Sequence, residues 1–138
     1  MKKILFVCRN NKFRSKLAEA YFNKINKNPE IKAESAGVFE SKEIHPTTIK
    51  VTKSLGVDIG GKSRGMSNEL VSEQDLVVIV ADDVPESIFM PKYTKQLIKL
   101  EIKDGIADDE ASTLKSAQNV IKSIGELNRK IEIGDIKL

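Results

Sequence analysis

The sequence predicts an α/β fold in three layers, with helices on both faces of a four-stranded parallel sheet. Short apolar segments rich in β-forming residues alternate along the chain with segments whose apolar residues recur at helical spacing. This alternation is typical of a doubly wound parallel sheet. The chain has 138 residues, so we expect one domain that spans residues 1–138.

Four short segments are expected to be strands, and the first of them is an apolar run rich in β-forming residues. The third of them, DLVVIVA, is the most strand-like run in the chain. The expected strands are KILFVC (3–8), IKAESAG (31–37), DLVVIVA (75–81) and KQLIKLEI (95–102).

Four other segments are expected to be helices, and they are residues 15–27, 45–56, 85–93 (a short one) and 109–131. Apolar residues form one stripe in the first and the last of them, although Gly125 is a mild flaw in the last. The second has Pro46 in its first turn and stops at Gly56, which are helix start and stop signals.

Composition argues against nucleic-acid binding. The chain has 23 basic and 20 acidic side chains, a net charge of +3, and 5% aromatic residues. This balance supports only a weak preference for anionic partners, and the low aromatic content argues against a nucleic-acid partner.

The cysteine count and the apolar runs indicate the cellular setting. One cysteine rules out an internal disulfide, and with one histidine it leaves no credible metal site, so we expect no metal or cofactor. No run approaches the roughly 20 apolar residues of a membrane span. The start MKKILFVCRNN turns polar too soon for a secretory signal, so we expect a cytoplasmic protein.

The loop after the first expected strand is the most informative part of the sequence. Cys8 ends the strand, and the loop after it leads into a helix. Backbone N–H groups and the helix dipole make such a loop an anion site. Asn10 and Asn11 suit it because asparagine tolerates left-handed backbone geometry. Arg14 can hold two phosphate oxygens at once.

These surroundings favour a reactive thiolate at Cys8, to which Ser15 can donate a hydrogen bond. A nucleophile inside an oxyanion site suits attack on phosphorus. We therefore expect a phosphate-binding loop, formed by Arg9, Asn10, Asn11, Lys12, Phe13, Arg14 and Ser15. The competing interpretation is a buried structural cysteine, which leaves the asparagines and Arg14 unexplained.

VCRNNKFRS together with LAEAYF resembles the phosphate loop and first helix of the low-molecular-weight protein tyrosine phosphatases. Thioredoxin-coupled arsenate reductases share that fold. The resemblance covers nearly the whole chain, through ESAGVF (34–39), HPTTIKVTKSLGVDIGGKSR (45–64), DLVVIVADD (75–83) and KDG (103–105).

The resemblance implies a phosphatase that works in two steps. Cys8 would attack phosphorus and form a phosphocysteine, while Arg14 and the loop N–H groups hold the transferring group. Ser15 would steady the thiolate and Asn11 would fix the shape of the loop. Asp104 matches the aspartate that protonates the leaving oxygen and then activates water.

Within the loop and first helix, three positions depart from the family pattern. Asn10 stands where glycine is usual, Phe13 where many members have a second cysteine, and Lys16 where proline or glutamine is usual. We expect the loop to close nevertheless, because asparagine accepts unusual dihedral angles.

The region around Asp104 also departs from the family. Gly105 replaces a proline, which predicts a less rigid loop, and Ile106 and Ala107 stand where tyrosines often wall a phosphotyrosine pocket. Phe39 is a candidate apolar wall, and Asp82 matches a position near the active site of the family.

Other titratable residues have simpler interpretations. Asp108, Asp109 and Glu110 are rivals of Asp104 for the role of general acid, but they precede the last expected helix, where acidic residues cap the helix and pair with its dipole. His45 precedes Pro46 and is interpreted as a cap or a surface residue.

Two alternatives to a phosphatase remain open. A thioredoxin-coupled arsenate reductase needs further cysteines, but Ala81 and Ile88 occupy that region, so only a single-cysteine reductase that uses an external thiol fits. The other alternative is a phosphate-binding module with weak turnover. The expected partners are a phosphorylated protein (on tyrosine or arginine), a small phosphate ester, and the oxyanions phosphate, vanadate and arsenate.

Overall fold

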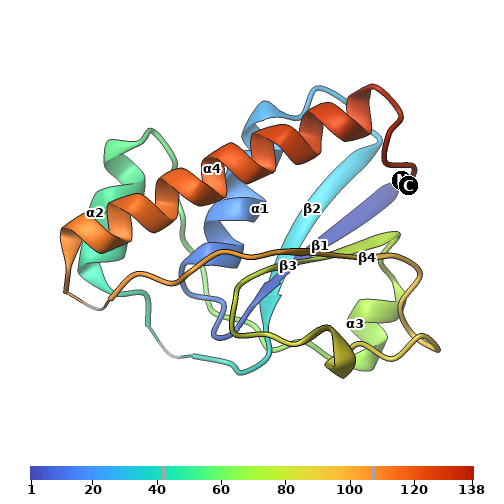
Figure 1. Ribbon diagram of the computed structural model, residues 1–138, viewed down its shortest axis with the longest axis horizontal. Helices are drawn as coiled ribbons and strands as arrows, with labels where there is room; N and C mark the ends of the chain where they lie inside the picture. The colour runs from blue at the N-terminus through green and yellow to red at the C-terminus, as the bar shows by residue number, and fades with distance from the viewer. Residues whose placement is uncertain (42, 107) are drawn as a thin grey trace.

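The computed structural model describes residues 1–41, 43–106 and 108–138, so the expectation for Ala107 lies outside the described residues (Figure 1). The elements in chain order are β1 (Lys2–Cys8), α1 (Arg14–Ile25), β2 (Ile31–Gly37), α2 (Pro46–Ser54), α3 (Asn68–Ser72), β3 (Leu76–Val80), the short 3-10 helix η1 (Glu86–Ile88), β4 (Leu97–Leu100) and α4 (Glu110–Glu132).

The four strands form one parallel sheet in the order β2-β1-β3-β4, which confirms the predicted sheet. In the pairing of β1 with β2, Cys8 lies opposite Gly37, so both strands end at the same level. Ligands bind beyond the carboxyl ends of strands in folds of this kind. The loop after Cys8 therefore lies at the edge of the sheet where a site is expected.

Helices cover both faces of the sheet, as predicted (Figure 1). Ile4 and Phe6 of β1 pack in the larger core with the apolar side chains of α1 and α4. Leu5 and Val7 point to the opposite face and pack with a smaller cluster that includes Val71 of α3. This alternation within one strand is what a sheet buried on both sides requires.

Two parts of the chain differ from the sequence-based expectation. The only helical part of segment 85–93 is η1, and α3 was not predicted. Five residues are too few for a helical period to show, although Ser67 caps α3 by accepting a hydrogen bond from the N–H of Leu70. No helix in the described ranges is long and apolar enough to cross a membrane.

Candidate active site

Asn11 shapes the loop after β1. Its backbone has a φ of 50°, in the left-handed region that asparagine tolerates. Its side-chain amide donates to the hydroxyls of Ser15 and Ser35, each at 2.9 Å, and its carbonyl accepts from the N–H of Arg64 at 2.8 Å. Asn11 is 1% exposed, so these bonds are shielded from water and hold the loop in one conformation.

The thiol of Cys8 is directed by the same hydrogen bonds. Cys8 Sγ lies 2.9 Å from Ser15 Oγ. Because Ser15 Oγ already accepts a hydrogen bond from Asn11, its own proton is available for the sulfur. Either atom of this pair can be the donor, and the sulfur is the acceptor when Ser15 directs its proton at it.

The close approach of the loop to β2 depends on Gly37. A Cβ at this position would lie 2.7 Å from the backbone nitrogen of Asn11 and 2.8 Å from the backbone carbon of Asn10. The backbone oxygen of Asn10 accepts a hydrogen bond from Ser63 Oγ at 2.8 Å. Among the described non-glycine residues only Asn11 and Asp108 have positive φ, so Asn10 does not need the unusual dihedral angles expected for it.

Arg14 is 2% exposed, and its guanidinium contacts three carboxylates. Nη1 lies 3.4 Å from Asp82 and donates to the carbonyl of Ile102 at 2.9 Å. Nη2 lies 3.0 Å from Asp83 and 3.5 Å from Asp104. These acceptors follow β3 and β4, so the ends of both strands position the guanidinium of Arg14.

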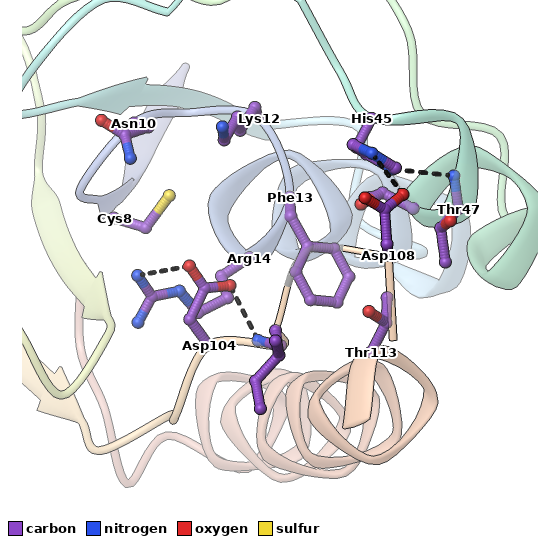
Figure 2. Close-up of a pocket in the computed structure, with 13 residues that line it drawn as sticks. Cys8, Asn10, Lys12, Phe13, Arg14, His45, Thr47, Asp104, Asp108 and Thr113 are labelled. Atoms are coloured by element: carbon purple, nitrogen blue, oxygen red, sulfur yellow. Dashed lines mark hydrogen bonds and ion pairs between the residues drawn. The ribbon is translucent and has the colours of Figure 1, made fainter. Parts of the chain in front are cut away.

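A cavity of about 170 Å³ opens beside the loop (Figure 2). Cys8, Arg14 and Asp104 all line it, so the structure brings together the three residues that the sequence marked for chemistry. Its lining residues are Cys8, Asn10, Lys12, Phe13, Arg14, His45, Thr47, Thr48, Asp104, Gly105, Ile106, Asp108 and Thr113.

Phe39, the candidate apolar wall, does not line this cavity. It is 58% exposed and lies beside Arg9, whose guanidinium carbon is 5.9 Å from the centre of the ring. A backbone hydrogen bond from the N–H of Phe39 to the oxygen of Arg9 holds it there. Asp82 is also absent from the lining and acts on the site through Arg14.

The loop that carries Asp104 is tied to α4. Ser116 Oγ donates to the oxygen of Lys103 at 2.6 Å, and Ser112 Oγ accepts from the N–H of Ile106 at 2.9 Å. A Cβ at Gly105 would lie 2.8 Å from Thr113 Cα, so glycine lets the loop lie close to the helix. Side chains of α4 thus hold the loop in the absence of the family's proline.

The acidic residues after this loop have separate partners. Asp109 caps α4 by accepting from the N–H groups of Ala111 and Ser112, as predicted. Asp108 instead pairs with His45, with 2.8 Å between His45 Nε2 and Asp108 Oδ1. His45 also caps α2, which confirms its expected role as a cap.

Comparison with known proteins agrees with this geometry. The model of the family "Low molecular weight phosphotyrosine protein phosphatase" matches residues 3–124. The chain belongs to this family.

Proteins similar to this chain include arsenate reductases and a protein tyrosine phosphatase. A glutaredoxin arsenate reductase of Synechocystis is 35% identical over 56% of this chain, and the matched part spans only 59% of that enzyme. Arsenate reductase 2 of Staphylococcus saprophyticus is 31% identical over 69% of this chain and 73% of its own. The solved low molecular weight protein tyrosine phosphatase of T. tengcongensis is 26% identical, with a TM-score of 0.82 over 95% of this chain and all (100%) of its own. The family thus contains relatives named for phosphatase and for arsenate reductase activity.

Proposed function

We propose that the protein is a phosphomonoester hydrolase of the protein tyrosine phosphatase type that acts through a phosphocysteine. The observation that carries this proposal is the arrangement of Asn11, Ser15 and Cys8, which directs a hydrogen-bond donor at a sulfur inside a cavity shared with Arg14 and Asp104. A purely structural cysteine needs no such donor.

In the first step Cys8 Sγ attacks phosphorus and the bond from phosphorus to the leaving oxygen breaks. Asp104 gives its proton to that oxygen. Arg14 and the N–H groups of residues 9–15 stabilise the charge on the transferring group. In the second step Asp104 removes a proton from water, the hydroxide oxygen attacks phosphorus, and Cys8 leaves as a thiolate.

The lining of the cavity beyond the loop bears on the substrate. Lys12, His45, Thr47 and Thr48 contribute polar groups, and Ile106 is 66% exposed at its side. A phosphorylated protein or a small polar phosphate ester therefore suits the cavity, and inorganic oxyanions suit the loop. A free thiol that must stay reduced accords with the cytoplasm.

A single-cysteine arsenate reductase is the second candidate, favoured by the names of the relatives. Cys8 would bond to arsenate with loss of water. An external small thiol would then attack Cys8 Sγ, which releases arsenite and leaves a mixed disulfide. A second external thiol would restore Cys8, so that the two thiols supply the two electrons.

The test is hydrolysis of p-nitrophenyl phosphate by the wild type and by Cys8→Ser, with arsenate reduction in glutathione measured in parallel. We expect metal-independent phosphate release that is lost in Cys8→Ser. Arsenite without phosphate release would favour the reductase. Vanadate binding without either activity would identify a phosphate-binding module.

A further inference from the structure

We propose that His45 is a positioning residue for the reaction, because it holds the loop that carries Asp104 through its contact with Asp108. This inference rests on the proposed function, in which Asp104 is the general acid. It concerns how accurately the acid is placed, and its test separates that question from whether hydrolysis occurs at all.

His45 makes two contacts, one as a hydrogen-bond acceptor and one as a donor. Its Nδ1 accepts the hydrogen bond from the N–H of Thr47 at 3.2 Å, which caps α2. A neutral imidazole that accepts at Nδ1 carries its proton on Nε2. Nε2 lies 2.8 Å from Asp108 Oδ1, so it donates to the carboxylate (Figure 2). The cap orients the ring, and the oriented ring holds Asp108.

Asp108 lies between Asp104 and the start of α4, in a backbone conformation that needs support. Its φ is 64°, which is uncommon for a residue other than glycine. Its side chain is 80% exposed, so the pair with His45 contributes little to overall stability. The effect of the pair is local. It ties the Asp108 end of the loop to the start of α2, through His45.

Asp104 depends on the loop for its position. Its Oδ1 accepts from the N–H of Gly105 at 2.9 Å, within the loop itself. Its Oδ2 reaches Arg14 only at 3.5 Å. A general acid must lie within hydrogen-bond reach of the leaving oxygen, and displacement by about 1 Å can cost roughly 100-fold in rate. His45, Asp104 and Asp108 line the same cavity. A shift of the loop would therefore move the Asp104 carboxyl relative to a leaving group bound there.

The variants separate the two contacts of His45. His45→Asn keeps a side-chain oxygen suited to capping α2 but is too short to reach Asp108. Asp108→Asn keeps an acceptor and tolerates positive φ, whereas Asp108→Gly suits the same φ and removes the contact. Lys50→Gln is the matched control, because it breaks another pair between α2 and α4, Lys50 with Glu110 at 3.2 Å, outside the loop.

The assay compares kcat/KM for phenyl phosphate, a poor leaving group that needs the acid, with kcat/KM for p-nitrophenyl phosphate, a good one. We expect His45→Asn and Asp108→Gly to lower the value for phenyl phosphate by about tenfold and the value for p-nitrophenyl phosphate by much less. Asp108→Asn should recover part of the loss, and Lys50→Gln should change neither value. Combined with Asp104→Asn, His45→Asn should cause no further loss.

Equal losses on both substrates, or the same effect from Lys50→Gln, would overturn the proposal and assign His45 a structural role only. Wild-type protein that hydrolyses neither substrate would instead refute the proposed function. If Asp104→Asn lowers kcat/KM for phenyl phosphate no more than kcat/KM for p-nitrophenyl phosphate, another residue is the acid. The inference about His45 would then fail together with that assignment.

Discussion

Replacing Asn11 by alanine tests the hydrogen bonds that hold the loop after β1. The change removes bonds to Ser15, Ser35 and Arg64, all made by a side chain that is 1% exposed. At about 1 kcal/mol for each buried bond, the loss is about 3 kcal/mol. Alanine at a φ of 50° adds about 1 kcal/mol of backbone strain, so we expect the free energy of unfolding to fall by about 4 kcal/mol.

Asn11→Gly is the matched variant, because it loses the same bonds but accepts the positive φ. Urea denaturation of the wild type and both variants gives the three free energies. We expect glycine to be about 1 kcal/mol less damaging than alanine. If Asn11→Ala costs under about 1 kcal/mol, the bonds do not hold the loop and the reasoning is wrong. If glycine is no better than alanine, the backbone strain is not real.

Three further changes have definite expected outcomes. Asp83→Asn removes a carboxylate that lies 3.0 Å from Arg14 Nη2 and competes with an oxyanion, so the inhibition constant of vanadate should fall about three- to tenfold, and a rise would contradict this. Gly105→Ala places a Cβ 2.8 Å from Thr113 Cα, so it should lower the free energy of unfolding by about 1–3 kcal/mol and reduce kcat, both of which a thermal melt and an activity assay would show. Gly125→Ala adds a Cβ that meets nothing within 4 Å inside α4, so chemical denaturation should give a gain of about 0.5–1 kcal/mol, and no gain would mean that the helix is strained there.

The four strands and the helices α1, α2 and α4 followed from the sequence, because the spacing of apolar residues shows which face of each element is buried. The apolar run 75–81 predicted β3, and the stripe in 109–131 predicted α4 to within a residue or two. The phosphate-binding loop stays a prediction, which the sequence suggested because Cys8, Asn11 and Arg14 lie within one short segment between a strand and a helix. Such a motif can be recognised from the spacing of nearby residues, because it does not depend on long-range contacts.

The family resemblance, rather than periodicity, selected Asp104 from a chain with many acidic residues. The structure added contacts between residues that are far apart in the sequence. Nothing in the sequence identified Asp82 and Asp83, among the other acidic residues, as partners of Arg14. Those contacts join residues 68 and 69 positions apart. The requirement for glycine at Gly37 likewise arises only where β2 passes close to the loop.

By itself, the sequence determined the fold class and predicted the phosphate-binding loop and its nucleophile, because each rests on local period or on residues a few positions apart. Only the tertiary structure decided what surrounds them: the carboxylates on Arg14, the support of the Asp104 loop by α4, and the contact of His45 with Asp108. The physical reason is that these contacts form where the ends of separate strands and helices meet, and that meeting is set by how the whole sheet packs.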